Sequence, residues 1–89
     1  MNEHKKVFSI KLTDLKNDKV STLITTTNLN YIKFHFRKLI SNQVDLKTCD
    51  YLADIDEEDD GVIETVGISK ETYDETIRTF KNLRKEKLI

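Results

Sequence analysis

The alternation of apolar and polar residues over residues 6–12 is the feature that most constrains how this chain can fold. In the segment "KVFSIKL", Phe8, Ile10 and Leu12 share one face, because successive side chains of a strand point to opposite sides. This period of two predicts a half-buried strand. Residues 20–27, "VSTLITTT", are β-branched almost throughout and predict a second strand. The polar segment between them favours a turn and therefore an antiparallel hairpin.

The next segment fits two periodicities. Residues 32–37, "IKFHFR", alternate as a strand would, yet they also belong to a longer apolar stripe at helical spacing. We favour the helix, since the stripe continues for three turns without Gly or Pro and is longer than a typical strand. Thr27 or Asn28 is placed to cap its start. The stripe consists of Leu29, Ile32, Phe36, Leu39 and Ile40.

Two strands and a turn are predicted around the acidic part of the chain. Residues 61–68, "GVIETVGI", are rich in β-branched residues, and the Asp60-Gly61 pair before them is typical of a turn between strands. Residues 50–55, "DYLADI", predict the preceding strand, with a short helix over residues 44–52 as the alternative. The favoured arrangement is a second hairpin that carries the acidic residues at its tip.

Residues 70–87 predict an amphipathic helix. Ser69 is a suitable N-cap, acidic residues follow in the first turns, and basic residues gather in the last ones, which complements the helix dipole. The predicted order is therefore ββαββα. Residues 1–89 are expected to form one small α+β domain in which two helices cover one face of an antiparallel sheet. The apolar stripe of this helix consists of Tyr73, Ile77, Phe80 and Leu83.

Charge is distributed unevenly along the chain, although the net charge is only −1. Residues 1–49 hold nine Lys or Arg and four Asp or Glu (+5), residues 50–64 hold eight acids and no base (−8), and residues 65–89 hold six bases and four acids (+2). A strongly basic chain would indicate nucleic-acid binding. This bipolar pattern indicates instead a molecule with two faces of opposite charge.

The acidic stretch partly matches a calcium-binding loop. With Gly61 at the sixth position of an EF-hand loop, Asp56, Glu58 and Asp60 fall on the first, third and fifth positions. The twelfth position needs a bidentate Glu and holds Gly67 instead. A weak Ca²⁺-binding loop is therefore a minor alternative, and we expect neither a metal site nor a cofactor.

We expect the same acids to form a contact surface for a protein with a basic surface. Consecutive carboxylates repel one another, so residues 56–60 are not expected to stabilise the fold. On a rigid hairpin they resemble a row of phosphates and suit the basic groove of a nucleic-acid-binding enzyme. This profile is similar in type to small accessory proteins of phages and other mobile elements that inhibit host enzymes such as CRISPR effectors. The expected partner-binding residues, all within residues 54–64, are Asp54, Asp56, Glu57, Glu58, Asp59, Asp60 and Glu64.

The helix predicted after the first hairpin offers an alternative surface for nucleic acid. Its Lys33, Arg37 and Lys38 lie close in sequence to Tyr31. Cations beside exposed aromatic rings bind phosphates, and the rings stack on bases. This alternative hypothesis is a small nucleic-acid-binding regulator, and either hypothesis allows a homodimer.

Nothing in the sequence indicates catalysis. The two histidines, His4 and His35, have no partner in a recognisable motif, and Cys49 lacks a CxxC or nucleophile context. Nucleotide-binding and hydrolase motifs are also absent. The sequence has no apolar run of membrane-spanning length and no signal-like start. With a single cysteine, which cannot form an internal disulfide, we expect a non-enzymatic protein of the cytoplasm that does not enter membranes.

Overall fold

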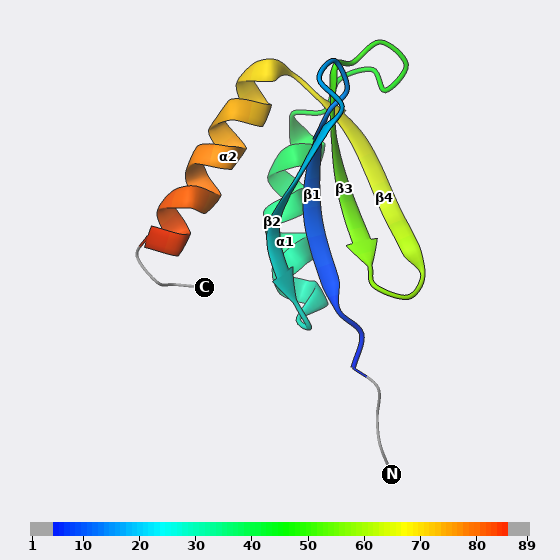
Figure 1. Cartoon of the computed structure of the whole chain (residues 1–89), viewed down its shortest axis with the longest axis vertical. Coiled ribbons are helices and arrows are strands. Elements are labelled where there is room, and N and C mark those ends of the chain that lie inside the picture. The colour runs from blue at the N-terminus through cyan, green and yellow to red at the C-terminus, as the bar shows by residue number, and fades with distance from the viewer. Residues whose placement is uncertain (1–4, 86–89) are drawn as a thin grey trace.

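The computed structural model describes residues 5–85, in which four strands and two helices follow the order ββαββα (Figure 1). This confirms the α+β fold class, both predicted hairpins and both predicted helices, including the helical assignment of residues 32–37. His4 and the predicted helical residues 86–87 lie outside the described residues. The elements are β1 (Phe8–Asp14), β2 (Lys19–Thr26), α1 (Leu29–Ser41), β3 (Tyr51–Glu57), β4 (Gly61–Ile68) and α2 (Lys70–Lys85).

All strand pairs of the sheet are antiparallel, and the strand order is β2-β1-β3-β4. The strands β1 and β3 are therefore central, while β2 and β4 form the two edges. Each hairpin contains one bulge, in which Leu23 is the extra residue of β2 and Ile63 is the extra residue of β4. A bulge increases the local twist and interrupts the regular alternation of side chains.

The fold repeats a ββα unit twice, although no repeat is visible in the sequence. In both hairpins the first strand ends in a buried carboxylate, Asp14 or Glu57, that accepts hydrogen bonds from backbone N–H groups of the following turn. Four residues later the backbone takes a positive φ, at Asp18 (51°) and at Gly61 (83°). Hydrogen bonds from the side chain and backbone of Asn17 lower the pKa of Asp14 below its ordinary value, because they stabilise the charged carboxylate.

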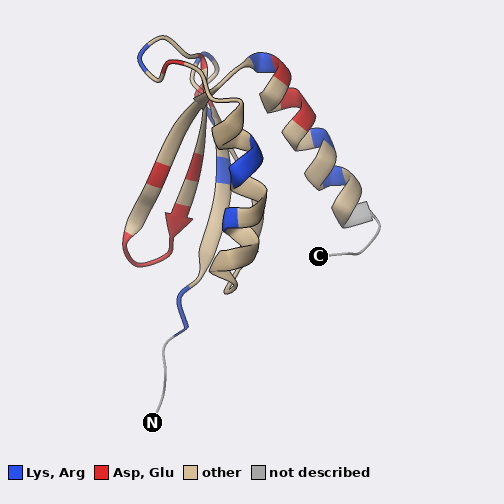
Figure 2. Ribbon diagram, turned by 180° about the vertical axis from the view of Figure 1, so that it is seen from behind, with Lys and Arg blue, Asp and Glu red and all other residues tan. Residues whose placement is uncertain are grey.

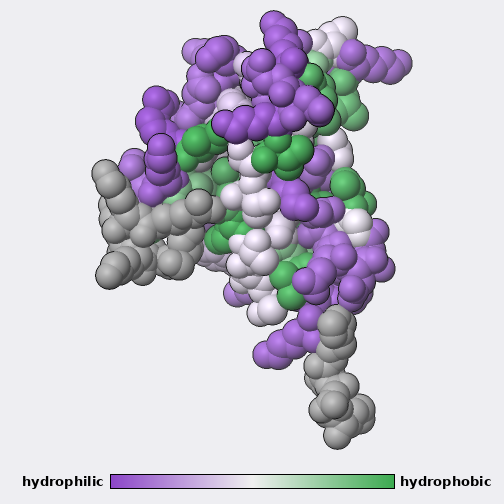
Figure 3. Space-filling model, in the orientation of Figure 1, coloured by the Kyte–Doolittle hydropathy of each residue, from purple (hydrophilic) through white to green (hydrophobic). Residues whose placement is uncertain are grey.

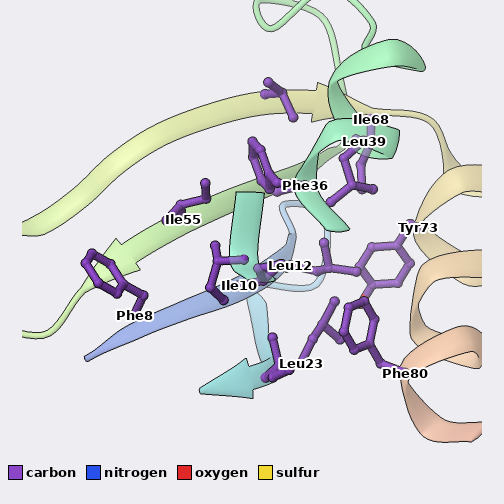
Figure 4. Packing of buried hydrophobic residues seen from close by; sticks show 14 residues of the cluster. Phe8, Ile10, Leu12, Leu23, Phe36, Leu39, Ile55, Ile68, Tyr73 and Phe80 are labelled. Atoms are coloured by element: carbon purple, nitrogen blue, oxygen red, sulfur yellow. The ribbon is translucent and has the colours of Figure 1, made fainter. Parts of the chain in front are cut away.

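The two helices pack on the same face of the sheet, as predicted (Figures 1 and 2). In β1 every second residue is buried beneath them, and the helices add Phe36 of α1 and Phe80 of α2 to one continuous core (Figure 4). The strand residues of the core are Phe8, Ile10, Leu12, Leu23, Ile24, Ala53, Ile55, Val66 and Ile68. The opposite face, called here the open face, carries Ser9, Lys11, Thr13, Thr22, Thr25, Asp54, Asp56 and Thr65.

The helix α2 is attached to the rest of the core through two aromatic contacts. The ring of Tyr73 lies 4.5 Å from that of Tyr51 at the start of β3, and the ring of Phe80 lies 5.1 Å from that of His35 in α1, measured between centroids. The α2 stripe predicted from the sequence therefore faces the core. Tyr73 and Phe80 are buried, and Ile77 and Leu83 are half-buried.

The loop of residues 43–50 crosses the outer side of β4 at Gly67. The Val44 N–H donates to the Gly67 carbonyl at 2.9 Å, and a Cβ placed on Gly67 would lie only 2.9 Å from the Cys49 Sγ and 3.0 Å from the Val44 oxygen. Glycine is required here because loop and strand approach so closely.

We expect Gly67→Ala to lower the free energy of unfolding by roughly 1–2 kcal/mol, because the added methyl group overpacks this contact. Chemical denaturation measures the change. In a Cys49→Ala background the same substitution should cost less, since the nearest obstructing atom is gone. Equal costs in the two backgrounds would show that the Cys49 thiol is not the atom that obstructs the added methyl group.

Candidate partner-binding site

The β3–β4 hairpin distributes the seven predicted partner-binding residues over three places. Alternation along the two strands puts two of them on the open face and two on the helix-covered face, and the remaining three lie in the turn. Only the three turn residues are both adjacent in the sequence and exposed to solvent. Asp54 and Asp56 lie on the open face, Glu57 and Glu64 on the helix-covered face, and Glu58, Asp59 and Asp60 in the turn.

Glu57 is a structural residue of the turn. Its side chain is 2% exposed and accepts hydrogen bonds from the backbone N–H groups of Asp59 and Asp60, the second at 3.3 Å. The N–H of Glu58 donates to the Val7 carbonyl at 2.9 Å, which ties the turn to the segment before β1. The expectation that residues 56–60 do not stabilise the fold is therefore wrong for Glu57. Its carboxylate is occupied by hydrogen bonds inside the turn.

Asp56 is also engaged within the sheet. The Lys11 Nζ from β1 lies 2.8 Å from its carboxylate, and both side chains are partly shielded from solvent. Cross-strand ion pairs of this kind add a few tenths of a kcal/mol to about 1 kcal/mol of stability. The expectation that residues 56–60 do not stabilise the fold is therefore wrong for Asp56 as well. Lys11 is also the direct register partner of Asp54, but the ion pair formed by its Nζ is with Asp56.

The turn itself forms an exposed anionic surface, called here the acidic tip and defined as Glu58, Asp59 and Asp60. The Lys6 Nζ lies 3.9 Å from the Asp60 carboxylate, but both side chains are more than 60% exposed (62% and 68%), so this pair is weak. Two large apolar side chains directly follow the tip. They are Val62, which is 58% exposed, and Ile63, which is 53% exposed.

Opposite charges gather on different parts of the molecule. Figure 2 shows the carboxylates along the β3–β4 hairpin and the cations on α1. The open face, seen in Figure 3, is mostly hydrophilic or near neutral in hydropathy, with separate apolar patches. Because backbone hydrogen bonds hold the acidic tip in one shape, its charges act from fixed positions. Its charge attracts cationic partners, and a surface of fixed shape loses less conformational entropy on binding than a flexible one that must first be ordered.

The residues of the alternative nucleic-acid surface do not form one patch. Lys33 and Arg37 border a pocket between α1 and the β3–β4 hairpin, whereas Lys38 borders the groove between α1 and α2. Tyr31 lies on the α2 side of the helix, with its ring 4.6 Å from that of His35. The structure therefore brings Lys33 and Arg37 together and separates them from Tyr31 and Lys38.

His35 is half-buried and lies against three aromatic rings. The rings of Tyr31, Phe34 and Phe80 have centroids 4.6, 5.3 and 5.1 Å from the imidazole centroid. Burial lowers the pKa of His35 below its ordinary value, and the charge of Lys38 adds to this effect. Its role in this structure is to join the two helices.

The described residues contain no ligand cluster of the kind that the calcium-binding alternative requires. Within residues 5–85, no group of three or more His, Cys, Asp or Glu side chains is arranged to hold a metal ion. Two acids of the supposed loop point in different directions, because Asp56 faces Lys11 on the open face and Asp60 lies in the exposed turn.

Comparison with models of protein families, with curated proteins and with solved structures gives no match to this chain. Neither described helix has the length and apolar content that crossing a membrane requires.

Two features of this surface were missed from the sequence. The pairing of Lys11 with Asp56 depends on the register between β1 and β3, which no local pattern gives. The exposure of Val62 depends on the helices covering only the opposite face of the sheet, and that of Ile63 coincides with the bulge in β4, neither of which a local pattern gives. The available signal was the β-branched composition of residues 61–68, which predicted a strand but not its position in the sheet.

Proposed function

We propose that this chain is a non-enzymatic protein-binding module that uses its acidic tip to bind a partner with a basic surface. The observation that supports this most is the construction of the tip. Three exposed carboxylates stand side by side on a turn whose N–H groups are bound by Glu57 and Val7. Repulsion among the three charges opposes folding, so a charge-dependent contact explains them better than stability does.

The more specific form of the proposal is an inhibitor. A rigid row of carboxylates is similar to a row of phosphates, so it suits the groove of a nucleic-acid-binding enzyme. Occupation of that groove would block the enzyme. Small accessory proteins of phages and other mobile elements, including those directed at CRISPR effectors, are the class that this form of the proposal names. The same proposal places the chain in the cytoplasm, where its single thiol, Cys49, remains reduced.

The proposal is tested by removing charge from the exposed acids while keeping the turn. Glu57 and Asp56 are left unchanged because they hold the hairpin together. The variant should fold as well as the wild type, and its association with a basic partner captured from the source cells should be slower by roughly tenfold or more. Its affinity should also lose most of its salt dependence. The substitutions are Glu58→Gln, Asp59→Asn, Asp60→Asn and Glu64→Gln.

The matched control reverses charge on α1 and leaves the hairpin intact. The variant Lys38→Glu should retain the same partner, because Lys38 borders the groove between α1 and α2 and not the hairpin, and binding of DNA and RNA should be weak and non-specific at moderate salt in every variant. Loss of the partner only in the reversed-helix variant would contradict docking through the acidic tip. Together with salt-sensitive nucleic-acid binding by the wild type, that result would favour the nucleic-acid alternative.

A further inference from the structure

The outer edge of β4 is open for most of its length. Among the described residues, Val44 alone pairs with this side of the strand, and it does so only at Gly67. In an antiparallel strand the N–H and C=O groups of one residue point to the same side, and every second residue repeats that direction. Because the Gly67 carbonyl points outward to Val44, Thr65 also directs its N–H and C=O away from the sheet.

A pocket adjoins this edge on the helix-covered face. It has a volume of about 240 Å³ and lies between α1 and the β3–β4 hairpin. Phe36, Ile40 and Ile55 supply apolar surface, while Lys33, Arg37 and Glu64 supply polar groups. Glu64 belongs to β4 itself, so a side chain on the same face of a neighbouring strand would lie over this pocket.

We propose that an extended segment of the partner adds to β4 as a fifth strand, and that its residues are alternately basic and apolar. This inference rests on the proposed function and specifies how the partner is held. Apolar side chains on one face of the added strand enter the pocket. Basic side chains on the other face lie beside Val62 and Thr65 and extend toward Asp54 on the open face. The added strand follows the regular register of β4 at Glu64–Val66, and the bulge at Ile63 shifts that register by one residue before Val62.

Charge selects this occupant over a second copy of the chain. If two β4 strands paired with each other, the acidic hairpins of both copies would be brought to one interface, and their like charges would repel. Pairing of β4 with the β2 edge of another copy would be a heterologous contact, which gives rings or open-ended polymers. A cationic strand from another protein meets neither difficulty and is drawn to the acidic tip.

The probe for this proposal is a seven-residue peptide that alternates Lys and Val and is capped at both ends. Its control is the same peptide with N-methyl groups on the residues that would pair with β4, so that charge and side chains are kept but backbone donors are removed. We expect the unmethylated peptide to bind the full chain at least tenfold more tightly in fluorescence anisotropy at low salt. It should also slow hydrogen exchange of the Thr65 amide at least tenfold.

Variants of Thr65 test the same edge from the protein side. Thr65→Pro removes the outward N–H, which edge strands tolerate, and should abolish the preference for the unmethylated peptide. Thr65→Ala keeps the N–H and should retain the preference for the unmethylated peptide. The exchange measurement on the wild-type chain decides the question if Thr65→Pro does not fold.

The outcomes separate this inference from the proposed function. Equal binding of the two peptides, or no binding of either, would overturn strand addition. If equal binding is lost in the charge-neutralised hairpin, the proposed function stands without strand addition. If the preference for the unmethylated peptide survives neutralisation unchanged, strand addition stands and the role of the acidic tip fails. Self-association of the peptide-free chain through β4 would also overturn the choice of partner.

Discussion

Truncation of Phe36 to alanine is expected to lower the free energy of unfolding by about 3–5 kcal/mol. The ring is 1% exposed and packs between α1 and the central strands of the sheet (Figure 4). Removing it loses the transfer free energy of the ring and leaves a cavity that the surrounding side chains fill only in part. Since small domains have a total stability of about 5–15 kcal/mol, the variant should be close to unfolding at room temperature. Urea denaturation followed by circular dichroism measures the loss.

Phe34→Ala is the matched control for this prediction. Phe34 belongs to the same helix two residues earlier, but its side chain is 59% exposed. Its truncation should change stability by no more than about 0.5 kcal/mol, as is usual for exposed positions. If the two variants were equally destabilised, the segment would not pack as a helix with Phe36 buried and Phe34 exposed. A strand would place both rings on the same face and would bury or expose them together.

That comparison also shows why the fold could be predicted to this extent. Ile32, Phe34 and Phe36 alternate as a strand would, and only the wider stripe that includes Leu39 and Ile40 favours a helix. The correct choice came from the length of the pattern. The alternation in β1 and the polarity of charge along α2 were equally local signals, and both were sufficient. Element types could be predicted because each depends on residues close together in the chain.

The arrangement of the strands could not be predicted in the same way. The order β2-β1-β3-β4 depends on pairing between β1 and β3, whose residues are more than 35 positions apart in the sequence, as in the pair Asp14 and Tyr51. No turn or spacing in the sequence specifies that contact. The open edge of β4 and the ion pair of Lys11 with Asp56 both follow from it.

The acidic run illustrates a second limit of sequence reasoning. Residues 56–60 are five consecutive carboxylates with the same charge, so a sequence argument treats them alike. The structure gives them three different roles, because Asp56 pairs with Lys11, Glu57 is buried in the turn and the other three are exposed. Asp14 at the end of β1 corresponds to Glu57, since each is buried and stands four residues before a residue with positive φ. Only the three-dimensional repeat of the ββα unit makes that equivalence visible.

The different role of Glu57 leads to a prediction that separates it from its neighbours. Glu57→Ala should lower the free energy of unfolding by about 2–3 kcal/mol, the range for losing hydrogen bonds to a buried charged acceptor. The N–H groups of Asp59 and Asp60 would then lose their carboxylate acceptor, and the turn would lose its fixed shape. Thermal and urea denaturation of the purified variant measure the loss of stability.

Two further substitutions show whether geometry or charge accounts for the effect. Glu58→Ala removes the same charge one residue later, where the side chain is exposed, and should change stability by no more than about 0.5 kcal/mol. Glu57→Gln keeps an acceptor oxygen without the charge and should fall between the two. If Glu57→Ala and Glu58→Ala were equally mild, the turn would not depend on the buried carboxylate. The hydrogen bonds of Glu57 would then not fix the shape of the acidic tip. The proposed function would lose the support that it takes from a tip of fixed shape.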